Sequence, residues 1–289
     1  MYKKIQIICM ILVTGCHFVT YASPTNAPIN DFPYALIAGG SKGIGYAIAE
    51  ALAKRNYNLI LIARHESSLK VAKQQLEKKY PIHVEILVKD LSFENTAQEI
   101  THWCIEKKIP LKMLCNVAGF GGTHDFLTLP LDSLRYMIRL NLESTVALSM
   151  SLLPLLEQNT PAYILNVASM AGFAPIPVKN VYSASKSAVV SFSYSLRYQL
   201  KDKHISVSCL CPGPVFTKPS IEKDTKEKLG WFGEQLAVPV NRVGEIAVSK
   251  TLKGRMIIVP GTWAKISSGV IRWLPQRWGT VMYYTKYIS

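Results

Sequence analysis

Residues 34–45 read Y-A-L-I-A-G-G-S-K-G-I-G and join a short apolar run to a glycine-rich turn. The turn leads directly into a helix-like stretch at 46–55. Gly39, Gly43 and Gly45 remove side chains where a backbone must approach a pyrophosphate, and the following helix would supply unpaired N–H groups and its positive dipole end. A strand, a glycine-rich turn and a helix in this order predict a dinucleotide-binding unit. The alternative is a glycine-rich turn that binds nothing.

Short apolar runs recur along the rest of the chain, at 34–38, 58–63, 83–88, 111–115, 162–167, 205–211 and 256–259. Between them lie stretches of about 15 to 25 residues with helical spacing. This alternation predicts an α/β fold, a doubly wound Rossmann-type parallel sheet flanked by helices. The 289-residue chain has neither an internal repeat nor a Gly/Ser/Pro-rich linker. We therefore expect one domain.

The end of the second apolar run bears on the choice of coenzyme. A Rossmann site for NAD carries Asp or Glu about twenty residues after the glycine-rich turn. Here Ala63 and Arg64 stand in that place. No carboxylate would repel a 2′-phosphate, and Arg64 and Lys42 could pair with one. The pattern favours NADP(H) over NAD(H), unless Arg64 is an ordinary surface residue.

A second group of residues suggests carbonyl chemistry. Tyr182 and Lys186 lie four residues apart in V-Y-S-A-S-K-S-A, and Ser169 follows the apolar run 162–168. If residues 180–203 are helical, the phenol and the ammonium share one face. A cation so placed lowers the pKa of Tyr182 towards the range useful for proton transfer near neutral pH. Ser169 could hydrogen-bond the same substrate oxygen, although a solvated helix face also produces this spacing by chance.

Together, residues 33–260 resemble a short-chain dehydrogenase/reductase, which implies that they form a Rossmann-type NADP-binding catalytic domain. The family's glycine motif appears at 38–45 with Ala38 where Thr is usual, its N-N-A-G motif appears as N-V-A-G at 116–119, and its P-G-x-x-x-T segment appears at 212–217. The resemblance implies a catalytic tetrad of Asn141, Ser169, Tyr182 and Lys186, in which the backbone carbonyl of Asn141 holds a water. It also implies a coenzyme site that comprises Gly39, Ser41, Lys42, Gly43, Ile44, Gly45, Arg64, Asp90, Leu91, Asn116, Ala118, Gly119, Tyr182, Lys186, Pro212, Gly213, Val215 and Thr217.

The activity that this resemblance implies is an NADP(H)-dependent oxidoreductase acting on a small-molecule carbonyl or alcohol. Tyr182 would give a proton to the carbonyl oxygen, Lys186 would stabilise the phenolate, and Ser169 would hold the oxygen. The alternative is a non-catalytic NADP-binding regulatory protein, or a membrane-associated interaction protein, on the same fold. Trp231, Phe232 and Leu236 lie where the family carries its substrate loop. Their apolar character points to a hydrophobic substrate that is lipid-, steroid- or acyl-like.

Residues 1–24 form a separate segment, with a basic start, an apolar run at 5–13 and small residues near Ala22. These features are typical of a secretory signal. The tetrad V-T-G-C ending at Cys16 resembles a bacterial lipoprotein signal, and an uncleaved membrane anchor is a third interpretation. We expect membrane association or export. Four cysteines beyond this segment suit a reducing compartment, and they favour a cytoplasmic location instead.

The charge and the aromatic residues bear on whether the protein binds nucleic acid, a membrane surface or a second copy of itself. The net charge is +14, yet the basic residues are spread out and no nucleic-acid motif accompanies them, so we expect no nucleic-acid partner. No His/Cys cluster has zinc spacing, so we expect no metal. In the C-terminal extension 261–289, Trp alternates with Lys and Arg as in interfacial helices, or else these aromatics cover the core or a pocket. The helices around 92–108 and 133–158, with Trp103 and Leu134, could pair two copies into a homodimer.

Overall fold

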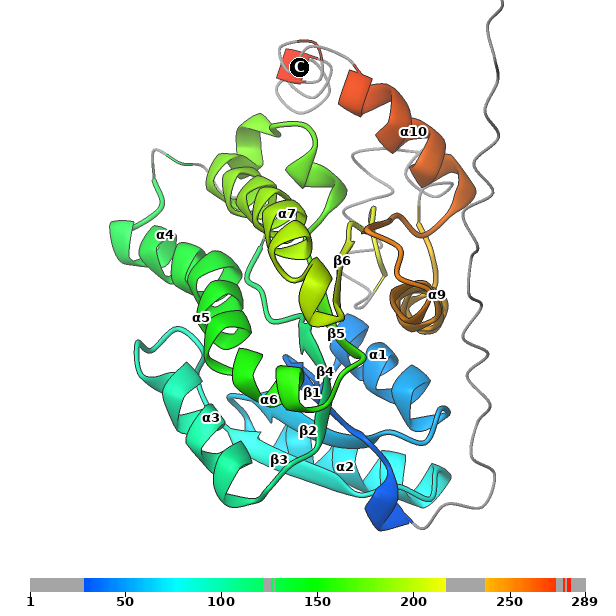
Figure 1. The fold of residues 1–289 in the computed structure, drawn as a ribbon. Helices are drawn as coiled ribbons and strands as arrows, with labels where there is room; N and C mark the ends of the chain where they lie inside the picture. The colour runs from blue at the N-terminus through cyan, green and yellow to red at the C-terminus, as the bar shows by residue number, and fades with distance from the viewer. Residues whose placement is uncertain are drawn as a thin grey trace, which may run out of the picture.

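The computed structural model describes residues 29–121, 126, 128–216, 237–273, 278, 280 and 281. A seven-stranded sheet in the order β3-β2-β1-β4-β5-β6-β7 forms its centre (Figure 1). All six neighbouring pairs are parallel. The strands are β1 Tyr34–Ala38, β2 Asn58–Ala63, β3 Val84–Val88, β4 Leu111–Asn116, β5 Ala162–Val167, β6 Ile205–Leu210 and β7 Ile257–Ile258. The predicted doubly wound α/β fold is confirmed, and each predicted apolar run contains a strand.

Helices flank the sheet. The α-helices are α1 Gly43–Ala53, α2 Glu66–Lys79, α3 Thr96–Glu106, α4 Leu131–Ile138, α5 Ser144–Ser151, α6 Leu153–Gln158, α7 Asn180–Gln199, α9 Val240–Leu252 and α10 Thr262–Trp273. The 3₁₀ turns are η1 Ile29–Asp31, η3 Met170–Gly172, η4 Pro177–Lys179 and η5 Lys201–Lys203. Between α4 and α5 the helix passes through a π-helical turn, η2 Arg139–Glu143.

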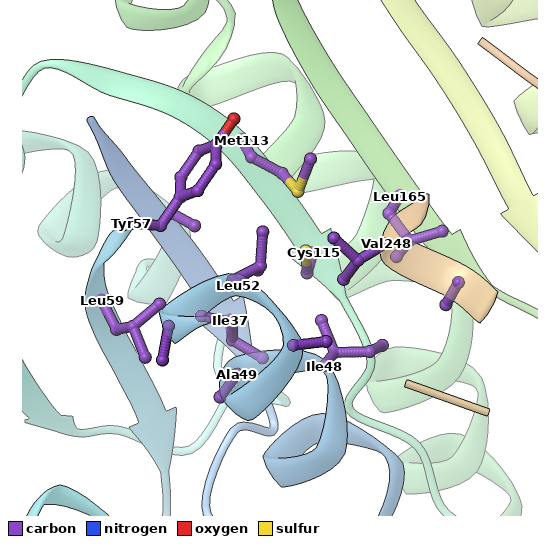
Figure 2. Close-up of a cluster of buried hydrophobic side chains, with 14 of the residues drawn as sticks. Ile37, Ile48, Ala49, Leu52, Tyr57, Leu59, Met113, Cys115, Leu165 and Val248 are labelled. Carbon is purple, nitrogen blue, oxygen red and sulfur yellow. The ribbon is translucent and has the colours of Figure 1, made fainter. Parts of the chain in front are cut away.

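Two apolar clusters bury the two faces of the sheet. Successive strand residues point to opposite faces, so Ala35 and Ile37 of β1 join the cluster under α1, α2 and α9, while Leu36 and Ala38 join the cluster under α3, α5 and α6. Figure 2 shows part of the first cluster, where Ile37, Ile48 and Val248 come from β1, α1 and α9. Burial on both faces explains why the strands are continuous apolar runs.

Helix α9 rests directly on α1. A Cβ added to Gly244 of α9 would lie 2.3 Å from the carbonyl oxygen of Ala47 in α1. Only glycine therefore permits this approach of the two backbones. Because α1 begins at the glycine-rich turn, the contact also fixes the helix on which the predicted dinucleotide site depends.

The structure also shows where the cysteines and the residues of the predicted dimer surface lie. The four cysteines of the described residues are buried and unpaired, and the sulfurs of Cys209 and Cys211 lie 3.7 Å apart on one face of the β6 end. Trp103 is half-buried, and Leu134 lines a small pocket beside Tyr182.

Across the described ranges, no helix has both the length and the apolar character needed to cross a bilayer. The predicted leader, with Cys16, lies outside these ranges.

Candidate active site

The glycine-rich turn after β1 is closed so tightly that side chains would not fit at Gly39 and Gly45. Gly39 and Gly43 have φ angles of 88° and 58°, in the left-handed region that favours glycine. A Cβ on Gly39 would lie 2.8 Å from the backbone nitrogen of Ala118, and one on Gly45 would lie 2.0 Å from the Gly39 oxygen. No side chain caps the following helix at Lys42. The first N–H groups of α1 are therefore open to an anion.

A groove of ≈ 320 Å³ runs from this turn across the ends of the central strands. It brings together nine residues of the predicted coenzyme site: Gly39, Lys42, Gly43, Ile44, Gly45, Arg64, Leu91, Ala118 and Gly119. Ser41 lies within the same turn. Sequence reasoning did not single out Lys89 and His65, which also line the groove. The signal for Lys89 was its place beside Asp90, directly after the third strand.

Arg64 is held at the rim of the groove by two contacts. Its Nη1 lies 3.9 Å from Oδ2 of Asp90, and its guanidinium lies 5.6 Å from the ring centroid of Tyr136. Asp90 is itself oriented, because its Oδ1 accepts hydrogen bonds from the backbone N–H and the hydroxyl of Ser92. Arg64 is therefore a positioned cation, although half of its side-chain surface stays exposed. The pairing of Arg64 with Asp90 was not predicted.

A second cavity of ≈ 240 Å³ adjoins the groove. Both share Ile44, Val117, Gly119 and Val167 as lining residues. Ser169, Tyr182 and Lys186 line this cavity together with Pro212, Gly213 and Val215, as the resemblance implies. Thr217 and the predicted substrate residues Trp231, Phe232 and Leu236 lie outside the described residues. Ser169, Tyr182 and Lys186 thus face a space that adjoins the glycine-lined groove.

Helix α7 places Tyr182 and Lys186 one turn apart, as predicted. Lys186 Nζ donates a hydrogen bond of 2.9 Å to the Val167 carbonyl and lies 5.9 Å from the centroid of the Tyr182 ring. Burial lowers the pKa of Lys186 to about 8, against an opposing influence from Cys209 and Cys211. Its ammonium is thus held at the end of β5, next to the cavity.

The expected lowering of the Tyr182 pKa by Lys186 is not found. Burial dominates and raises the pKa of Tyr182, while a hydrogen bond with the Ser169 hydroxyl lowers it by less. The physical reason is that the phenolate would lose more solvation inside the cavity than this hydrogen bond restores. Tyr182 therefore remains a protonated phenol at neutral pH.

Ser169 owes its position to a turn. Strand β5 ends at Val167, and Ser169 is the N-cap residue of η3, where its Oγ accepts a hydrogen bond of 3.1 Å from the Ala171 N–H. This bond fixes the hydroxyl at the cavity wall. A serine in the capping position can hold this acceptor contact and still offer its O–H to another oxygen.

Asn141 acts through its side chain. Its Oδ1 accepts from the Phe120 N–H at 2.7 Å, and its Nδ2 donates to the Phe120 carbonyl at 2.9 Å and to the Ser185 hydroxyl at 3.0 Å. The backbone carbonyl, to which the resemblance assigns a water, accepts a long contact of 3.4 Å from the Thr145 hydroxyl. Asn141 therefore ties the segment after β4 to α7. We did not anticipate this role.

Gly121 follows Phe120 and lies close to the ring of Tyr182. A Cβ on Gly121 would lie 2.8 Å from Cε2 of Tyr182, so the bare backbone of Gly121 lies against the phenol ring.

The Asn116 side chain is buried and donates to the Ser149 hydroxyl and to Oδ1 of Asn166, at 3.1 Å and 2.9 Å. Asn116 thus points into the interior, away from the groove to which the resemblance assigns it.

Comparison with known proteins agrees with this geometry. A family model described as short chain dehydrogenase matches residues 33–228, more than half of the chain. The very-long-chain 3-oxoacyl-CoA reductase of Mus musculus is 30% identical over 200 residues, which are 68% of this chain and 64% of that protein. The chain thus spans less than two thirds of the length of this relative.

Solved structures share the fold. The RhlG/NADP active-site complex of Pseudomonas aeruginosa has a TM-score of 0.69 and 25% identity, and the match covers 79% of this chain and 94% of that one. A short-chain dehydrogenase from Sphingobium yanoikuyae in complex with NADPH has a TM-score of 0.70 and 23% identity, with 85% and 97% covered. At the latter identity the likeness establishes the fold alone.

Proposed function

Because the chain belongs to the short-chain dehydrogenase family of oxidoreductases, we propose that it uses NADP(H) to interconvert a hydrophobic carbonyl compound and its alcohol. One observation carries the proposal. Ser169, Tyr182 and Lys186 line a single cavity whose walls are shared with the glycine-lined groove. A substrate oxygen in that cavity would meet a hydroxyl, a phenol and an ammonium, beside the place where a nicotinamide ring would lie.

The residues of the groove fit a dinucleotide. Gly39 and Gly45 form a cradle that a single Cβ would fill, which suits close approach of a pyrophosphate. The N-terminus of α1 is open to negative charge. When bound, the coenzyme supplies or accepts the hydride. The chain's own residues hold the coenzyme, orient the substrate and move the proton.

Arg64 supports NADP(H) over NAD(H). Its guanidinium is positioned at the groove rim, with Lys42 and Lys89 among the other lining residues. Its pairing with Asp90 is long and half-exposed, and such surface pairs contribute about 0–1 kcal/mol. A charge-assisted hydrogen bond to a 2′-phosphate contributes about 1.5–3 kcal/mol. The phosphate therefore competes successfully with Asp90 for the arginine.

Tyr182 serves as the proton donor in the direction of reduction. Burial raises the pKa of this phenol, so it carries its proton at neutral pH. When the carbonyl carbon gains a hydride, the oxygen becomes basic and takes this proton. Ser169 holds the same oxygen, and the Lys186 ammonium lowers the energy of the phenolate that remains.

The preference for a hydrophobic substrate rests on the cavity walls. Ile44, Val117, Val167 and Val215 line the cavity together with Phe120. Tyr182 also lines a separate small pocket, together with Phe126, Leu129, Leu134 and Met137. The name of the mouse relative describes a reductase of very-long-chain 3-oxoacyl-CoA. An acyl-like or similarly apolar ketone is therefore the first substrate class to test.

The test measures oxidation of NADPH and of NADH by the full chain, with a panel of hydrophobic ketones, aldehydes and 3-oxoacyl compounds. Tyr182→Phe should reduce turnover by about 100- to 10,000-fold and leave NADPH binding intact. Arg64→Ala should lower kcat/KM for NADPH by about 10- to 100-fold and change the value for NADH little. Full turnover in Tyr182→Phe would remove the phenol from the acid role. Equal use of both coenzymes by the unsubstituted protein would refute the NADP(H) preference.

A further inference from the structure

Helix α10 presents an apolar stripe to solvent. Trp263, Ile266, Val270 and Trp273 have exposed fractions of 49%, 53%, 54% and 91%. Their spacing of three and four residues places them on one side of the helix. We refer to these four residues as the α10 stripe. A contiguous row of large apolar side chains in this position is unusual for a surface helix, because such patches mark interaction sites.

The opposite side of α10 is already packed. Ala264 is buried and Ile271 is half-buried, and both pack in a further apolar cluster that includes Val189 and Val190 of α7. Arg272 fixes the end of the helix, because its Nη2 donates to the Tyr194 hydroxyl at 2.9 Å. The α10 stripe therefore cannot become the inner face without the loss of these contacts. Figure 1 shows α10 at the edge of the molecule, outside the sheet.

The C-terminal part of the sequence, to which α10 belongs, is basic. Residues 241–289 contain eight Lys and Arg and a single acid, Glu245. Glu245 is already paired with Arg55, which lies in the turn after α1. Lys265 and Arg272 lie on α10 itself and are exposed. An apolar row that contains two tryptophans and is flanked by lysine and arginine suits the boundary between lipid headgroups and acyl chains.

We propose that the α10 stripe docks this protein onto an anionic lipid surface, with the four side chains inserted at the headgroup–acyl boundary. The charge of the segment argues for this partner over a second copy of the chain. A two-fold dimer on this face would bring two basic segments together within a molecule whose net charge is +14. Anionic headgroups instead attract each nearby Lys or Arg by about 1 kcal/mol.

Docking would also bring lipid close to the catalytic cavity. The Arg272 guanidinium lies 5.4 Å from the centroid of the Phe173 ring. Phe173 directly follows η3, the turn that Ser169 caps. The helix that would touch lipid is therefore in contact with the segment that positions the catalytic serine. Docking to lipid goes beyond the proposed reaction, because it would place that reaction at a membrane surface.

The test is co-sedimentation of the full chain with vesicles of phosphatidylcholine alone or with about 30% phosphatidylglycerol. The α10 variant carries Trp263→Ser, Ile266→Ser and Val270→Ser. The matched control carries Val71→Ser, Ile105→Ser and Met150→Ser on α2, α3 and α5, where the exposed fractions are 53%, 53% and 68%. We expect the unsubstituted protein and the control to bind anionic vesicles, and the α10 variant to lose about tenfold or more in partition coefficient.

Three results would overturn the proposal. The first is no binding by the unsubstituted protein, and the second is equal binding by the α10 variant, because another segment would then hold the chain to lipid. The third is a change from dimer to monomer in the α10 variant with lipid binding unchanged, which would assign the face to a second copy. Circular dichroism of the variants checks that they fold.

A second measurement needs no disruptive change. Lipids with brominated acyl chains should quench the tryptophan fluorescence of the unsubstituted protein. Trp263→Phe with Trp273→Phe keeps the face apolar and should remove most of that quenching. Quenching of the same depth in this variant would show that the α10 stripe does not enter the lipid.

Discussion

Replacing Gly244 by alanine tests the contact between α9 and α1 that holds the glycine-rich turn in place. The added Cβ would lie 2.3 Å from the Ala47 oxygen and 2.4 Å from its carbonyl carbon, where an ordinary contact begins at 3.4 Å. Both clashing atoms belong to backbone, so no side chain can turn away. The two helices must separate by about 1 Å along a packed face.

The magnitude follows from two opposing effects. Alanine stabilises a helix by about 1 kcal/mol relative to glycine. Overpacking of this kind costs about 1–3 kcal/mol, occasionally more, and the separation also weakens dispersion contacts between the helices. Because the clash is with backbone, the upper end of that range applies, about 3 kcal/mol. After subtraction of the helix gain of about 1 kcal/mol, we expect a net loss of about 2 kcal/mol in the free energy of unfolding, or a Tm lower by about 3 °C for a chain of 289 residues.

The assay is urea denaturation with Gly269→Ala as a matched control. Gly269 also lies in a helix, yet a Cβ there meets nothing within 4 Å. The same substitution should therefore raise stability by about 0.5–1 kcal/mol at Gly269 and lower it at Gly244. If Gly244→Ala were as stable as the unsubstituted protein, α9 and α1 would not be in backbone contact, and α9 would not fix the position of α1.

Three further predictions concern the candidate active site. Gly121→Ala should displace the Tyr182 ring by several tenths of an ångström and lower kcat about 10- to 100-fold, with Tm nearly unchanged; an unaltered kcat would show that the ring tolerates the methyl group. Asn141→Ala removes three hydrogen bonds to Phe120 and Ser185. Both kcat and the free energy of unfolding should fall, the latter by about 1–3 kcal/mol. An unchanged kcat would show that the side chain of Asn141 is not needed for the reaction. Burial lowers the pKa of Lys186 from 10.5 to about 8, so between these pH values the unfolded chain binds one more proton than the folded chain. The free energy of unfolding should therefore rise with pH by up to about 1.4 kcal/mol per unit. Denaturation at pH 8 and pH 10 should show this rise relative to Lys186→Met, and the same pH dependence in both proteins would contradict it.

Much of the fold could be read from the sequence because its signals are local. Strands buried on both faces are continuous apolar runs, and a phenol and an amine four residues apart share a helix face whatever surrounds them. Glycines 39 and 45 were identified because the backbone conformation of one and the crowding of the other are set within the turn itself. These features need no knowledge of which segments meet in space.

The features that escaped prediction depend on contacts between distant segments. Arg64 meets Asp90 only because β2 and β3 are neighbours in register, with Ala63 opposite Val88. Asn116 turns inward because β4 and β5 pair so that it lies opposite Asn166. The pKa of Tyr182 rises because the folded chain encloses the phenol, and spacing along a helix carries no information about enclosure.

The π-helical turn at Arg139–Glu143 has a consequence for how this region tolerates changes in length. The N–H of Ser144 bonds to the Arg139 carbonyl five residues back, so the turn holds one residue more than an α-helix would. In a regular helix, one inserted residue rotates everything beyond it by about 100°. Here the bulge absorbs that rotation, so Ser144 and Leu148 stay buried while Asn141 still reaches Phe120. Deleting a single residue within 139–143 should therefore leave a continuous helix and still break the contact of Asn141 with Phe120 beside the candidate active site.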